Sequence, residues 1–155
     1  MRIHLIAVGD RMPAWVQAGY AEYAKRLPRE CSLRLVEIAP GKRTKGADVA
    51  RLMAEEGDRI LAAIPKGALV VALEVKGQPW STEDLSRRLG EWMQGGRDVA
   101  LLVGGPDGLD ARGRARADLL WSLSPLTLPH PLVRVVLAEQ IYRAHSLLRG
   151  HPYHR

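Results

Sequence analysis

The chain has 155 residues, with 23 Lys and Arg against 17 Asp and Glu, which gives a formal net charge of +6. Its 46% hydrophobic and 26% charged residues are ordinary for one compact domain and exclude a disordered or collagen-like chain. One cysteine cannot form an internal disulfide, and no apolar run approaches the roughly 20 residues that cross a bilayer. We therefore expect a cytoplasmic protein with no membrane partner.

The first half of the chain alternates strand-like and helix-like hydrophobic patterns. Apolar residues recur at helical spacing after Pro13 and after Asp48, a residue suited to cap a helix. The patterns predict a strand at 1–9, a helix at 13–27, a strand at 33–38, a basic loop at 40–46 and a helix at 48–64. The apolar stripes of the two helices include Trp15, Val16, Tyr20, Val49, Leu52 and Ile60.

The second half begins with an apolar run at 68–73, whose length fits a strand covered on both faces. Ser81 and Asp84 occupy the positions of a capping box, and two glycines at 95–96 close that helix. The remaining patterns predict a strand at 99–103, an Arg-rich helix at 110–117, a strand at 119–123 and a helix at 130–148. This alternation predicts a single α/β domain, residues 1–155, with a parallel sheet and ligand chemistry at the carboxyl ends of its strands.

The final helix is more apolar than a helix half exposed to water normally is. Its apolar residues are Leu132, Val133, Val135, Val136, Leu137, Ile141, Ala144, Leu147 and Leu148. A second covering surface is therefore needed, which either a homodimer contact or neighbouring helices of the same chain would provide.

Three predicted strand ends, at 73–77, 103–108 and 123–131, turn sharply after an apolar strand. Gly104 and Gly105 lack Cβ atoms, which would allow a ligand to approach the backbone and would allow positive φ, but a pair of glycines after a strand is a weak signal and a structural turn is the alternative. The segment 123–131 holds three prolines among largely apolar residues, so we expect an ordered, buried loop. Its backbone polar groups would be satisfied either by a bound ligand or by neighbouring loops.

Several function classes lack their sequence signatures. No G-x-G-x-x-G follows the first strand and no G-x-x-x-x-G-K-[ST] occurs, which argues against dinucleotide oxidoreductases and P-loop NTPases. No H-x-x-x-H or C-x-x-C pairing exists among the histidines and the cysteine, so no metal site is expected.

The net charge is concentrated in the last third of the chain. Residues 1–110 hold 16 basic and 15 acidic residues, whereas residues 111–155 hold seven arginines and two acids, together with four of the five histidines. This asymmetry predicts a localised surface for a polyanion such as RNA, the alternative being a chance excess on a solvated helix face. The last five residues combine Tyr153 and Arg155 with two imidazoles, a set that suits base stacking and phosphate binding but also fits a frayed terminus.

Three segments resemble those of the bacterial large-subunit ribosomal RNA pseudouridine methyltransferase H family, in the SPOUT superfamily. They are GGPDG at 104–108, WSLSPLTLPHPLVR at 121–134 and HPYHR at 151–155; the segments at 5–9 and 39–43 fit as well. The resemblance implies a parallel-sheet α/β-knot, in which the C-terminal helix threads a loop to form a trefoil knot, and a homodimer. It also implies a partner, 23S rRNA within the assembled ribosome, and methylation of N3 of a pseudouridine.

The resemblance further implies S-adenosyl-L-methionine as the cofactor, and its contacts transfer by position onto the three strand ends. They are Leu73, Gly104, Leu123, Ser124, Pro125, Leu126, Thr127 and Leu128.

Proton removal from N3 and methyl transfer then suggest roles for residues near the end of the chain. We hypothesise that Arg134, Arg143 or Arg155 stabilises negative charge on the uracil carbonyls, that Tyr153 stacks on the base, and that His130 or His154 assists proton removal. An ordinary helical ion pair with Glu139 is an alternative role for Arg143. A ribosome-binding assembly factor without catalytic activity is the alternative function.

Overall fold

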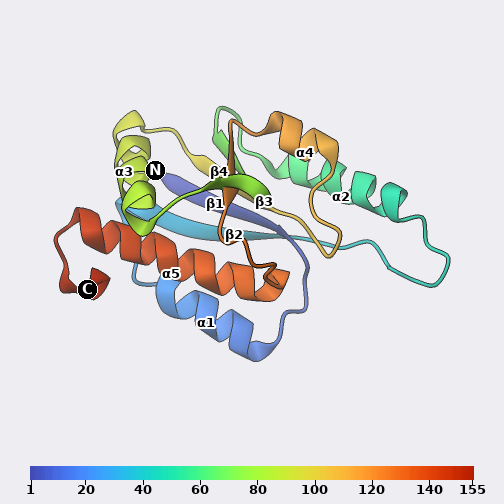
Figure 1. Cartoon of the computed structure of the whole chain (residues 1–155), viewed down its shortest axis with the longest axis horizontal. Coiled ribbons are helices and arrows are strands. Elements are labelled where there is room, and N and C mark those ends of the chain that lie inside the picture. Colours follow the sequence, from blue (N-terminus) through green and yellow to red (C-terminus); the bar gives the residue numbers. More distant parts are fainter.

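A five-stranded parallel sheet forms the centre of the computed structural model, which describes residues 1–155 (Figure 1). Its strands lie in the order β2-β1-β4-β3-β5, and every neighbouring pair is parallel. The strands are β1 (Arg2–Val8), β2 (Ser32–Ile38), β3 (Leu69–Pro79), β4 (Val99–Val103) and β5 (Leu119–Ser122). The predicted parallel α/β architecture is therefore confirmed, whereas the trefoil knot stays a prediction.

Helices cover both faces of this sheet because its central strands are apolar on both sides. The helices are α1 (Ala14–Ala24), α2 (Val49–Ala63), α3 (Thr82–Gly95), α4 (Ala111–Arg116) and α5 (His130–Leu148), with short 3-10 turns at Arg29–Cys31 and Pro152–His154. Leu5 and Leu101 point toward α3 and α5, while their neighbours Ile6 and Leu102 belong to a second apolar cluster that includes Ile60 of α2. Figure 1 shows α1 beside α5, and α2 with α4 on the other side of the sheet.

Local sequence signals set most helix boundaries. The Asp48 side chain accepts a hydrogen bond from the Arg51 amide at the start of α2, and Ser81 with Asp84 forms both bonds of the predicted capping box of α3. Gly96 ends α3 with a left-handed φ of 72°. Two residues of the predicted apolar stripes are exposed instead, Trp15 at 59% and Val49 at 42%, and both lie in the first turn of their helix.

Neighbouring helices of the same chain cover much of α5. This helix lies between α1 and α3, where Leu137, Ile141 and Ala144 are buried, while Leu132 and Val136 remain half-buried. The apolar character of α5 is therefore largely explained without a partner, and the homodimer stays a prediction. No helix has the length and apolar composition that crossing a membrane requires.

A buried arginine fixes the first turns of α5 to the sheet. Arg134 is 1% exposed, and it donates hydrogen bonds to the Glu37 carboxylate at 2.8 Å and to the Gly9 carbonyl at 2.7 Å. Gly9 directly follows β1, and Glu37 is the second-last residue of β2. Arg134 therefore holds the start of α5 over the edge of the sheet where these two strands end. A charged donor bonded to an ionised acceptor is among the stronger protein hydrogen bonds.

Strand β3 continues beyond the predicted run at 68–73 through an irregular stretch. Both Leu73 and Gln78 are in register with Trp121 of β5, so residues 74–77 form an extra loop in the ladder. Gly77 is required there, because a Cβ atom would lie 2.8 Å from the Leu120 carbonyl carbon. The irregularity places Glu74 and Val75 at the edge of the sheet where β3, β4 and β5 end.

Candidate functional site

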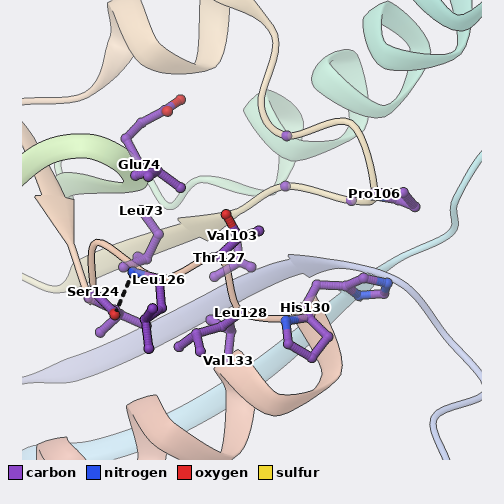
Figure 2. A pocket seen from close by; sticks show the side chains of 16 residues that line it. Leu73, Glu74, Val103, Pro106, Ser124, Leu126, Thr127, Leu128, His130 and Val133 are labelled. Carbon is purple, nitrogen blue, oxygen red and sulfur yellow. Dashed lines mark hydrogen bonds between the residues drawn. The ribbon is translucent and has the colours of Figure 1, made fainter.

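A pocket of about 580 Å³ lies at the carboxyl ends of β3, β4 and β5, where the three predicted strand ends meet (Figure 2). Its volume falls in the range of pockets that bind small organic ligands. The lining comprises Leu73, Glu74, Val75, Val103, Gly104, Gly105, Pro106, Gly108, Leu123, Ser124, Leu126, Thr127, Leu128, Pro129, His130 and Val133. Apolar side chains and loop backbone dominate this lining, which suits a flat organic ring.

The structure brings together most of the residues predicted to hold a cofactor. Seven of the eight line the pocket: Leu73, Gly104, Leu123, Ser124, Leu126, Thr127 and Leu128. Pro125 is the exception, since it is exposed and does not line the pocket. Residues as far apart in sequence as Leu73 and Leu128 therefore share one cavity.

The proline-rich loop is not buried, contrary to the sequence prediction. Leu126 is 72% exposed, and Pro125 and Thr127 are exposed as well. Leu126 and Thr127 face the open pocket, whereas Leu123 and Leu128 pack against the core and are only partly exposed. The loop satisfies one backbone amide itself, since Leu126 N–H donates to Ser124 Oγ at 2.9 Å (Figure 2).

Gly104 and Gly105, which follow β4, allow close packing of the backbone. They do not adopt the positive φ that we predicted. Neither Gly104 nor Gly105 has a positive φ, whereas Gly108 does, at 82°. A Cβ atom on Gly104 would lie 2.3 Å from the Gly108 carbonyl carbon, and one on Gly105 would lie 3.0 Å from Val8 Cγ1. The loop at 104–108 therefore folds back on itself. Because Gly104 and Gly105 have no Cβ atoms, its backbone packs closely at this side of the pocket.

An ion-pair network that the sequence analysis missed supports the same wall from outside. Glu56 of α2 is 2% exposed and accepts hydrogen bonds from Arg43 and from the Gly41 amide, while Arg43 also bonds Asp107 at 3.2 Å. Burial raises the pKa of Glu56, but the bonds from Arg43 and Gly41 outweigh this effect and lower it. Arg43 lies in the predicted basic loop at 40–46, and through its bond to Asp107 it positions the loop at 104–108.

His130 is the only imidazole at the pocket. Burial lowers its pKa below the ordinary value of 6.5, and the positive charge of Arg134 lowers it further. Its Nδ1 atom is enclosed without a hydrogen-bond partner. His130 is therefore neutral at neutral pH and able to accept a proton. Arg134 does not line this pocket, and its terminal nitrogens are bonded to Glu37 and Gly9.

The other proposed catalytic residues lie at the far end of α5. Arg143 lies roughly 20 Å from His130 along the helix, at 1.5 Å per residue. Tyr153 and His154 belong to the short turn at Pro152–His154, which Arg155 follows, and this turn packs against α5. The Tyr153 ring centroid lies 5.0 Å from the Arg143 guanidinium carbon. Arg143 also bonds Glu139 at 2.8 Å, so the helical ion pair exists. Within one chain, therefore, Arg143, Tyr153, His154 and Arg155 lie away from the pocket.

The basic residues of the last third do not form one surface, contrary to the prediction. Arg112 on α4 pairs with Asp58 and Asp110 on one side of the sheet, whereas α5 and its arginines lie on the other side. Arg134 is buried. Proximity in sequence did not translate into proximity in space, because β5 lies between α4 and α5. No group of three or more potential metal-ligating side chains comes together.

The fold and the pocket define a class: an α/β protein with a pocket of the size that binds small organic ligands, at the end of its parallel strands. A family described as "Predicted SPOUT methyltransferase" matches residues 1–154. Two solved structures share the fold. A methylase family protein from Haemophilus influenzae has a TM-score of 0.55 and 12% sequence identity, and the match covers 96% of this chain and 67% of that one. A methyltransferase from Legionella pneumophila, solved in complex with S-adenosylmethionine, has a TM-score of 0.52 and 11% identity, and the match covers 93% of this chain and 66% of that one.

Curated relatives narrow the assignment. A protein of Thioalkalivibrio sulfidiphilus named ribosomal RNA large subunit methyltransferase H is 72% identical over 100% of this chain and 99% of its own length. One of the same name from Methylococcus capsulatus is 59% identical over the full length of both chains. The chain belongs to the ribosomal RNA large subunit methyltransferase H family of SPOUT methyltransferases.

Replacing Gly104 with Ala tests the role of its close packing. We expect Gly104→Ala to displace the loop at 104–108, because the added Cβ meets the Gly108 backbone, and to weaken binding of S-adenosylmethionine at least tenfold in calorimetry, about 1.4 kcal/mol. Gly95→Ala is the matched control, since a Cβ there meets nothing within 4 Å. Equal affinities of the two variants would contradict this role.

Proposed function

We propose that this chain transfers a methyl group from S-adenosyl-L-methionine to N3 of a pseudouridine in 23S rRNA, acting as a homodimer on the assembled ribosome in the cytoplasm. The observation that carries the proposal is the single pocket formed by seven of the eight predicted cofactor residues. It is supported by full-length relatives that are named ribosomal RNA large subunit methyltransferase H.

The pocket residues suit this cofactor. The side chains of Leu73, Leu123 and Leu128 would enclose the adenine ring, and the loop at 104–108 offers backbone groups at close range because its glycines lack Cβ atoms. When bound, S-adenosylmethionine supplies an electrophilic methyl group on a positively charged sulfur. The apolar lining limits the access of water to that group, and fixed loops reduce the entropic cost of aligning it with the base.

His130 is the group in this chain best placed to move a proton. Nucleophilic attack by N3 requires the loss of the N3 proton, and a neutral imidazole at the pocket is able to take it. We assign acceptance to Nε2, because Nδ1 is enclosed by the protein. Arg134 contributes indirectly, by holding the first turns of α5, which carry His130, in place.

The tail at 151–155 would act on the pocket of a second copy. Within one chain, roughly 20 Å of helix separates Arg143 from His130. A two-fold dimer brings equivalent surfaces of two chains together and can place one chain's tail beside the other's pocket. There Tyr153 would stack on the base, and Arg143 or Arg155 would stabilise negative charge on the uracil carbonyls, with His154 as a second candidate base.

Incubation of ribosomes with methyl-labelled S-adenosylmethionine tests the function directly. We expect one labelled methyl group on N3 of a pseudouridine in 23S rRNA, located by mass spectrometry of nuclease fragments. Ribosomes from a strain that lacks this gene provide the unmethylated substrate, and Gly104→Ala, assayed below its weakened dissociation constant for S-adenosylmethionine, provides the matched low-activity protein. Ribosome binding without incorporation would instead favour a non-catalytic assembly factor.

The pH dependence of the reaction tests the role of His130. Because the pKa of His130 lies below 6.5, the neutral form persists through neutral pH, and protonation removes the base only in more acidic solution. We expect the single-turnover rate to fall on the acid side of that pKa. His130→Ala should lower the single-turnover rate by about 10²-fold or more, and it should abolish this fall in rate at acid pH, the acid limb of the pH profile. An unchanged acid limb in His130→Ala would exclude His130 as the base.

Mixing two impaired variants tests the shared site, at a concentration of S-adenosylmethionine too low to saturate Gly104→Ala. Gly104→Ala damages the pocket, and the double variant Tyr153→Ala, Arg155→Ala damages the tail. Random pairing should yield about one half heterodimers, each with one intact pocket facing one intact tail, and thus about a quarter of the wild-type activity. Light scattering establishes the dimer mass beforehand. A monomer mass, or a mixture no more active than its components, would contradict the shared site.

A further inference from the structure

Only two of the residues that line the pocket are ionisable, Glu74 and His130. Burial and the charge of Arg134 lower the pKa of His130, so that residue is neutral at neutral pH. The pocket lining therefore carries a single formal charge, the negative charge of the Glu74 carboxylate. Figure 2 shows Glu74 next to Leu73 and on the opposite side of the pocket from His130.

Glu74 is held at this position by the irregular end of β3. The Glu74 side chain is 22% exposed, so its charge is only partly screened by water. Its one charged neighbour is Arg114 of α4, whose Nη1 atom lies 3.6 Å from Glu74 Oε1. The Arg114 side chain is 45% exposed and does not line the pocket, so Glu74 is the only member of this pair that borders a bound ligand.

The charge of the bound cofactor changes during the proposed reaction. S-adenosylmethionine carries a sulfonium, an ammonium and a carboxylate, and thus a net positive charge. Methyl transfer breaks the bond between carbon and sulfur, leaves the electron pair on sulfur, and produces S-adenosylhomocysteine, a thioether with no net charge. A fixed carboxylate near the site stabilises the first species and has little effect on the second.

We propose that Glu74 selects the cofactor by charge, favouring the cationic S-adenosylmethionine over its neutral product and thereby promoting product release. This inference rests on the proposed function, because it requires that S-adenosylmethionine occupies this pocket. A role in hydrogen bonding to the ribose hydroxyl groups would be different, since both species carry the same ribose.

The test measures the dissociation constants of S-adenosylmethionine and S-adenosylhomocysteine by calorimetry. We expect Glu74→Gln, which keeps the shape and removes the charge, to weaken binding of S-adenosylmethionine about tenfold and binding of S-adenosylhomocysteine less than about twofold. Glu74→Asp, which keeps the charge, should retain the preference of the wild type. Glu91→Gln is the matched control, because Glu91 is an exposed carboxylate on α3 outside the pocket.

The outcomes separate this inference from the proposed function. Equal weakening of both ligands in Glu74→Gln would overturn charge selection and indicate a ribose or structural contact. Unchanged binding of both ligands would overturn it too. A wild-type chain that binds neither ligand would overturn the proposed function and the inference together, whereas one that binds both but shows no Glu74 effect would overturn the inference alone.

Discussion

The parallel alignment of β3, β4 and β5 is the constraint on which the rest of the site depends. Strand β3 is in register with both neighbours, pairing Ala72 with Leu102 of β4 and Leu73 with Trp121 of β5. Parallel strands end at the same edge of a sheet, so the loops that follow these strands converge although long stretches of sequence separate them. Burial of the apolar strands therefore also determines where a ligand can bind.

The start of α5 closes the remaining side of the pocket, and its position depends on one buried charge. Arg134 joins α5 to Gly9 after β1 and to Glu37 in β2, while His130 and Val133 from the same turns line the pocket. Burying a guanidinium without partners would be costly, so these bonds make one arrangement of α5 strongly preferred. The same arginine lowers the pKa of His130, so it both supports the fold and affects the residue that we propose as the base.

The sequence predicted the sheet and most of the pocket, because both follow from local patterns. Apolar runs identified β3 and β4, and the glycines and prolines after them marked the loops. Contacts between residues that are far apart in the chain could not be predicted from these local patterns. The spacing of four residues puts His130 and Arg134 on one face of a helix, but it does not reveal that Glu37 and Gly9 bind Arg134. The cluster of arginines in sequence did not reveal that α4 and α5 lie on opposite sides of the sheet.

Two features of the site have a sequence signal that the predicted cofactor and catalytic residues do not reflect. Glu74 directly follows the apolar run at 68–73, and a charged residue at the carboxyl end of a buried parallel strand is a candidate for ligand contact. The separation of Arg143 from His130 follows from the length of a continuous helix. The contribution of a second copy to the pocket, which we propose, has no local sequence signal, because it would depend on an interface between two chains.

A crystal structure of the protein with S-adenosylmethionine is the most direct test of the central claim, that the three strand ends form the cofactor site. We predict electron density for the cofactor between Leu73, Gly104 and the loop at 123–128, with its sulfonium methyl group accessible from the side of His130. Density for the cofactor elsewhere on the chain, with this pocket empty, would contradict the account.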